Sequence, residues 1–252
     1  IVERTAAKPT HRNRPDPVET MMLKRAALSI LLLSLVSCGA TLVRPTPAQL
    51  EALDSAEREP VEANKAAVAA AKRSLAELEA DVPRLERDVD IAERLIERET
   101  ADVEVTRLRF EAAQDTRDAD AMIPARANRA RATAALELAQ AQLGREEAAL
   151  DLLLGRIDEA SAAVEVAEAE LALAEIRAVQ SAASDESPEA AEREAAFETR
   201  LAESRATAAS EKESVARLQT LFEKADRAYR QAAAKTPADP GQGVEPSATT
   251  AE

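Results

Sequence analysis

The stretch that decides the fold covers residues 61–110 and reads VEANKAAVAAAKRSLAELEADVPRLERDVDIAERLIERETADVEVTRLRF. Apolar side chains recur in it at every seventh position, as Val61, Val68, Leu75, Val82, Val89, Ile96, Val103 and Phe110. A second row, three residues later, holds Ala71, Leu78, Leu85 and Ala92 and is interrupted by Asn64, Glu99 and Thr106. Steps of three and four residues place both rows on one narrow stripe of a helix. The stretch therefore predicts a long coiled-coil helix.

The same period returns further along the chain. Its first row is Leu136, Leu143, Leu150, Ile157, Val164, Leu171 and Ala178, and its second row is Ala139, Leu153, Ala160, Ala167 and Ala174. Further apolar residues broaden this stripe toward a second neighbour, namely Leu138, Leu152, Val166 and Leu173. A second long helix is predicted, and a third helix is expected to touch it.

A third, weaker stripe follows the start signal Ser187-Pro188. It comprises Phe197, Leu201, Ala208, Val215, Leu218, Phe222, Ala225 and Tyr229, and Ser204 and Glu211 weaken its middle. The predicted fold class is all-α: a long antiparallel coiled-coil hairpin with a third long helix. Whether that helix closes an elongated three-helix bundle is left open.

Caps and helix breakers set the predicted boundaries. Thr46 and Gln49 form a capping-box pattern, and Pro60 is expected to end the helix that they start. Pro83 is expected to kink its helix without breaking it. The predicted elements are a short helix over 47–59, coiled-coil helices over 60–113 and 125–180 joined by a turn over 114–124, a linker over 181–187, a third helix over 188–234 and a disordered tail over 235–252.

Composition limits the classes of function. Aromatic residues make up 2% of the 252 residues and tryptophan is absent, so a thick globular core is not expected. The net charge is −14, and residues 1–37 contribute six basic and three acidic residues, which leaves −17 for the remainder. Because phosphate binding needs clustered Lys and Arg, nucleic acid is not an expected partner.

The N-terminal region is predicted to be a targeting segment. Residues 1–20 look like an upstream extension, and Met21 or Met22 is the better start. Lys24 and Arg25 then precede the apolar run 26–36, which as a helix would span about 16 Å and is too short to cross a bilayer. This pattern is typical of a signal peptide over 21–37.

The residues Leu35, Val36, Ser37 and Cys38 resemble the lipobox of bacterial lipoproteins. The resemblance covers residues 21–39 and implies that Cys38, the single cysteine, is thioether-linked to diacylglycerol after signal cleavage. Residues 38–46 would then be a lipid tether. Gly39 is not the Asp associated with inner-membrane retention, which favours the outer membrane, facing the periplasm. The alternative is a free or buried cysteine after an ordinary apolar segment.

Catalytic and metal chemistry find little support in the sequence. The single histidine, His11, precedes the predicted signal, so Ser/His, Cys/His and zinc constellations are not expected. Asp115, Asp118 and Asp120 at the predicted tip lack the Gly and Glu of an EF-hand, and they are interpreted as a solvated acidic turn or a partner contact. Nearby arginines are expected to neutralise them, namely Arg126, Arg129 and Arg131. We expect no enzyme activity, cofactor, metal or small-molecule substrate.

Two functions fit these features best. The first is a structural or scaffolding lipoprotein that binds a helical envelope protein, or itself, through its coiled-coil seams. The second is an accessory of an envelope efflux or transport assembly, because residues 107–150 resemble the α-hairpins of periplasmic efflux adaptors and outer-membrane efflux proteins. The flanking β-domains of the adaptors have no counterpart in the sequence. An envelope hydrolase and an unprocessed cytoplasmic coiled coil are weaker alternatives.

Overall fold

The computed structural model describes residues 44–183 and 187–236. All regular structure in that part of the chain is helical, and it comprises α2 (Pro47–Glu51), α3 (Ser55–Asp115), α4 (Ala119–Ala183) and α5 (Pro188–Lys235). At 1.5 Å per residue, the 61 residues of α3 and the 65 residues of α4 make rods of about 90 and 100 Å. The predicted all-α class, with two long arms and a third long helix, is confirmed.

Capping boxes set the starts of α2 and α3. Thr46 and Gln49 exchange side-chain to backbone hydrogen bonds at α2, as predicted. Asp54 and Glu57 do the same at α3. The predicted helix over 47–59 is therefore replaced by two elements, because α2 stops at residue 51 and α3 begins at residue 55.

Prolines lie inside α3 and α4 without ending them. Pro60 and Pro124 were both predicted to mark boundaries, yet each is the sixth residue of its helix. Each removes one backbone hydrogen bond, and the cap that precedes it together with the seam packing that follows keeps the helix continuous. Helix α3 also continues through Pro83, as expected.

The predicted stripe of α3 is its buried side. Its two rows are buried or half-buried along their length, with Val61 1% exposed and Ala92 fully buried, while most of the side chains between them are exposed. The polar residues that interrupt the second row occupy the same side: Glu99 is 7% exposed, and Asn64 and Thr106 are half-buried. These polar residues therefore lie within the interface.

Helix α4 carries two seams on nearly opposite sides. The predicted heptad rows form one of them. The other is formed by two further rows at sevenfold spacing, which are Leu152, Glu159, Val166 and Leu173, and Gly155, Ala162, Ala169 and Ile176. These residues are buried or half-buried as well. At about 100° per residue, the centres of the two seams lie roughly 160° apart.

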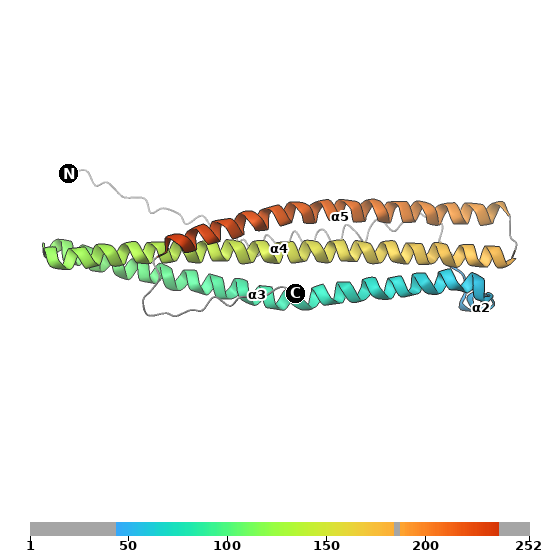
Figure 1. Ribbon diagram of the computed structural model, residues 1–252, viewed down its shortest axis with the longest axis horizontal. Helices are drawn as coiled ribbons and strands as arrows, with labels where there is room; N and C mark the ends of the chain where they lie inside the picture. The colour runs from blue at the N-terminus through green and yellow to red at the C-terminus, as the bar shows by residue number, and fades with distance from the viewer. Residues whose placement is uncertain (1–43, 184–186, 237–252) are drawn as a thin grey trace, which may run out of the picture. The chain divides into compact units, whose positions relative to one another are not determined.

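The two seams of α4 place it between α3 and α5. Helix packing runs along α3 and α4 and along α4 and α5, whereas α3 and α5 do not pack along each other. Figure 1 shows the resulting row of three long helices with α4 in the middle. The sequence had left open whether the third helix closes a bundle. In the structure it does not, because α5 packs on the side of α4 that faces away from α3.

Both interfaces are antiparallel, as cross-helix contacts show. Between α3 and α4, Lys72 Nζ lies 2.7 Å from Glu168 Oε1. Between α4 and α5, Arg145 Nε lies 3.1 Å from Asp226 Oδ1, near the turn end of α4. Near the other end, Gln180 Nε2 donates to the carbonyl of Ala190 at 2.8 Å. Increasing residue number on one helix therefore meets decreasing number on the next.

The remaining boundaries differ modestly from prediction. Helix α4 begins at residue 119 and ends at residue 183, so it is longer at both ends than the predicted 125–180. Ser187 caps α5 by accepting a hydrogen bond from the backbone N–H of Ala190, as the Ser187-Pro188 signal predicted. The predicted tail lies, from residue 237 onward, outside the described residues.

Candidate interaction surface at the hairpin tip

The hairpin extends beyond the third helix. Thr236, which follows α5, donates through Oγ1 to the carbonyl of Ala134 at 3.5 Å. Residues 105–115 of α3, the turn 116–118 and residues 119–133 of α4 therefore form a two-helix extension, here called the tip, that α5 does not cover (Figure 1). Its 15 residues on α4 correspond to about 20 Å.

The turn at the tip is a tight helix–helix connection. Arg117 donates its backbone N–H to Gln114, and Asp118 donates its own to Ala113, which is the Schellman pattern that ends a helix. Arg117 adopts a left-handed conformation with φ of 53°, where glycine is more usual. The predicted turn over 114–124 thus shrinks to three residues, because Asp118 starts α4 at once by capping it.

The three predicted tip acids take separate roles. Asp118 Oδ1 accepts hydrogen bonds from the backbone N–H groups of Asp120 and Ala121, at 3.0 and 3.1 Å. Asp120 lies in the first turn of α4, where a negative charge favours the helix dipole, and Asp115 ends α3. All three are exposed. Among residues 44–183 and 187–236, no group of His, Cys, Asp and Glu side chains is arranged to hold a metal ion.

The arginines of the tip do not neutralise those acids. No ion pair in the described part of the chain joins Arg126, Arg129 or Arg131 to Asp115, Asp118 or Asp120, so that expectation is wrong. The reason is geometric, because the arginines begin two turns into α4, beyond the reach of acids at the turn.

An aromatic ring holds one of these arginines in place. The guanidinium of Arg129 lies over the ring of Phe110, 5.7 Å from its centroid. These two residues, together with Arg126, line a groove of about 470 Å³ on the side of the tip, here called the tip groove. Its other lining residues are Ala130, Thr133, Ala134 and Glu137. Arg129 lies one heptad before Leu136, and Phe110 is the last residue of the predicted α3 row. The contact between Arg129 and Phe110 could therefore have been predicted from the sequence.

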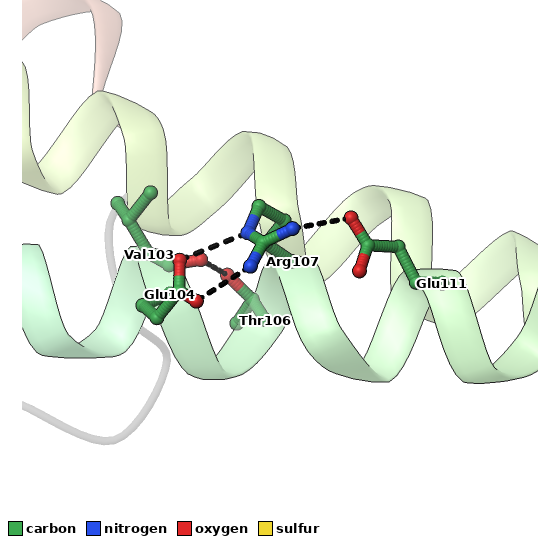
Figure 2. A network of polar contacts seen from close by, with 5 residues as sticks. All are labelled: Val103, Glu104, Thr106, Arg107 and Glu111. Carbon is green, nitrogen blue, oxygen red and sulfur yellow. Dashed lines mark hydrogen bonds and ion pairs between the residues drawn. The ribbon is translucent and has the colours of Figure 1, made fainter. Parts of the chain in front are cut away.

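Arg107 is neutralised within its own helix. Figure 2 shows its guanidinium between Glu104 and Glu111, with Nη2 2.6 Å from Glu104 Oε1. The hydrogen bond from Arg107 lowers the pKa of Glu104, and the two carboxylates raise the pKa of Arg107. Beside it, the hydroxyl of Thr106 donates to the carbonyl of Val103 (Figure 2). It also lies within hydrogen-bond distance of the carbonyl of Asp102, and these contacts let a polar residue occupy the seam.

Charge divides the hairpin into two regions. Residues 105–133 carry six arginines and four acids, whereas residues 44–104 and 134–183 together carry 26 acids and 12 basic residues. The rest of α3 and α4 is here called the shaft. The tip therefore carries a net positive charge, and the shaft carries a net negative charge. Three exposed or half-exposed apolar side chains of the tip add to this contrast, with Ile123 75%, Leu108 51% and Val105 43% exposed.

Three exposed acids from two helices lie close enough to influence one another in the part of the shaft nearer the tip. Burial, followed by the negative charges of Asp151 and Glu93, raises the pKa of Glu147. None of the three makes an ion pair within the part of the chain that the structure describes. Glu93 comes from α3 and the others from α4, so only the register between the two helices brings them together.

Another groove lies toward the opposite end of the helices and is lined by residues of α3, α4 and α5. It measures about 630 Å³, and Leu173, Ala178 and Leu201 are among its lining residues. Three of its charged groups are paired between α4 and α5: Arg205 binds Glu170 at 2.7 Å, and Arg177 binds Glu194 at 2.6 Å.

The predicted lipidation site Cys38 and the signal residues Lys24, Arg25, Leu35, Val36 and Ser37 lie outside the described residues. No helix of the described residues is both long enough and apolar enough to cross a membrane. The chain matches no protein-family model, and comparisons with curated proteins and with solved structures also find no match.

Proposed function

We propose that the chain is a lipid-anchored coiled-coil lipoprotein of the bacterial envelope that acts as a structural or scaffolding protein without enzymatic activity. The observation that carries the proposal is the tip, because a two-helix extension that α5 does not cover offers a surface for another protein. Both predicted seams are filled by the chain's own helices, so a partner would bind outside them.

The anchor is proposed at Cys38, on the outer membrane and facing the periplasm. Five residues lie between it and Arg44, and the six steps from Cα to Cα span at most about 21 Å. Arg44 donates to the carbonyl of Glu168 at 3.3 Å, and along α4 the tip begins about 50 Å from that residue. An anchor near one end of a long hairpin would therefore hold the basic tip away from the membrane.

Metabolic palmitate labelling tests the anchor. Wild-type chain should take up label and fractionate with membranes, and Cys38→Ala should take up none and become soluble. Label on both forms, or on neither, contradicts lipidation at Cys38.

Site-specific photo-crosslinking tests the interaction surface. A photoreactive residue at Ile123, 75% exposed on the tip, should give one dominant crosslinked species in cells. Leu221 on α5, 57% exposed, is the matched control and should give none. Equal crosslinking at the two positions would contradict the proposal that a partner binds preferentially at the tip.

The alternative is an accessory role in an envelope efflux or transport assembly. The two-helix tip, which α5 does not cover, is the part of the chain that such an assembly would contact. Mass spectrometry of the Ile123 crosslink separates the two roles. A membrane transport component in the crosslink favours the alternative, and a structural envelope protein or a second copy of this chain favours the scaffold.

A further inference from the structure

One face of the helical layer carries two unpaired charge clusters of opposite sign. The tip groove presents Arg126 and Arg129, both exposed and without an ion pair among the described residues. The acids Glu93, Glu147 and Asp151 lie on the shaft. Arg126 and Glu147 are three heptads apart, so they share one side of α4, about 32 Å from each other along its axis.

We infer that two copies of this chain associate antiparallel through this face, with Arg126 and Arg129 of each copy against the acids Glu93, Glu147 and Asp151 of the other. Two clusters on one face are what an isologous pairing needs, because a single twofold axis then satisfies both contacts at once. The axis passes near Glu137, midway between Arg126 and Glu147, and the hairpins overlap over about 50 Å.

Electrostatic features of the single chain support this pairing. Stacking on Phe110 holds the guanidinium of Arg129 in place before a partner arrives, which lowers the cost of ordering a long side chain. Burial, and then the repulsion from Asp151 and Glu93, raises the pKa of Glu147. Arginines from a second copy would relieve that repulsion. The pairing does not depend on a lipid at Cys38, so it and the proposed anchor can fail separately.

Sedimentation velocity of the full-length chain carrying Cys38→Ser tests the pairing. A dimer is expected at about 0.05 M NaCl, weakened at least about tenfold in about 0.5 M NaCl, where charges are screened. A chain that stays monomeric at about 100 µM in low salt, or a dimer that salt does not weaken, overturns the inference.

Charge reversal makes the test specific. A tip variant, R126E with R129E, and a shaft variant, E147R with D151R, should each be monomeric. Mixed together they should form a heterodimer, because acidic tips then meet basic shafts and basic tips meet acidic shafts. Failure of the mixture to associate overturns the inference, provided circular dichroism shows both variants helical.

A matched control changes the same charge elsewhere on the tip. Arg109 lines a different groove, with Thr106 and Asn128, and Arg131 is outside the tip groove. The double variant R109E with R131E should therefore dimerise within about twofold of the parent. Glu137→Gln should tighten the dimer, because it removes a like charge near the axis. Loss of the dimer in the control variant, or a weaker dimer in Glu137→Gln, would contradict the proposed arrangement of the two copies.

Discussion

The two interfaces of α4 are built in different ways. Toward α3, aliphatic side chains from both helices alternate in strict heptads. Toward α5, α4 offers small residues such as Gly155 and Ala162, and α5 supplies large ones such as Phe197 and Leu218. Ion pairs are concentrated on the α5 side, at Arg145, Arg177 and Arg205. The interface toward α3 was predicted from both helices, whereas toward α5 the sequence of α4 indicated only the row that holds Leu152, Val166 and Leu173.

Removing the largest buried side chain of α5 should have the greatest effect. Phe197 is 1% exposed, and Phe197→Ala leaves a cavity that should lower the free energy of unfolding by about 3–5 kcal/mol. Urea unfolding followed by circular dichroism measures it. Leu221→Ala, at a residue 57% exposed, should change stability by less than about 0.5 kcal/mol. Similar losses for the two variants would show that α5 is not held by its apolar side.

Replacing each of two glycines of α4 by alanine should change the stability of the protein in opposite directions. A Cβ at Gly144 meets nothing within 4 Å, so Gly144→Ala should stabilise the protein by about 1 kcal/mol through helix propensity. A Cβ at Gly155 would lie 2.5 Å from Leu218 Cδ1, so Gly155→Ala should lose about 1 kcal/mol net. Thermal unfolding of each variant measures the difference. Adding Leu218→Ala should make Gly155→Ala favourable, and independence of the two changes would exclude the close approach.

Replacing the buried acid of the α3 seam should strengthen the other interface. Glu99 is 7% exposed, and its partner Arg98 is exposed, 2.8 Å away. Glu99→Leu removes a buried charge and should raise the free energy of unfolding by about 1–2 kcal/mol. Glu97→Leu, at an exposed position of the same helix, is the control and should have little effect. A loss of stability in Glu99→Leu would mean that the ion pair of Glu99 with Arg98 stabilises the fold by more than burial of the charge costs.

The smallest effect concerns pH. The raised pKa of Glu147 means that the folded protein binds its proton more tightly than the unfolded chain does. That contribution is complete below the ordinary glutamate pKa of about 4.3 and is lost as pH rises through the folded value. Glu147→Gln should therefore be more stable than the parent at pH 7 by less than about 0.5 kcal/mol, since the group is largely exposed, and equal to it below about pH 4.

Urea titrations of Glu147→Gln and the parent across this pH range measure that difference. Glu165→Gln, at an exposed position of α4, is the control and should show a smaller difference. If the difference in stability between Glu147→Gln and the parent grew toward low pH, the pKa of Glu147 would be lowered and not raised by folding.

The sequence alone determined the helices, the interface between α3 and α4, and one row of the interface between α4 and α5. The rows from Val61 and from Leu136 belong to single helices, and their period depends only on the geometry of the α-helix. The caps at Thr46 and Ser187 were also predictable, since a cap involves residues three apart in the chain.

Tertiary structure decided the rest. Leu152, Val166 and Leu173 had indicated a second neighbour for α4, but only the contacts with α5, such as Leu218 opposite Gly155, show that this neighbour forms a layer and not a closed bundle. Pro60 and Pro124 lost their role as boundaries because seam packing outweighs one missing hydrogen bond. The meeting of Glu93 with Glu147 required the register between two helices. Local periodicity specifies which side of a helix is buried, whereas the identity of its neighbour depends on contacts between residues far apart in the chain.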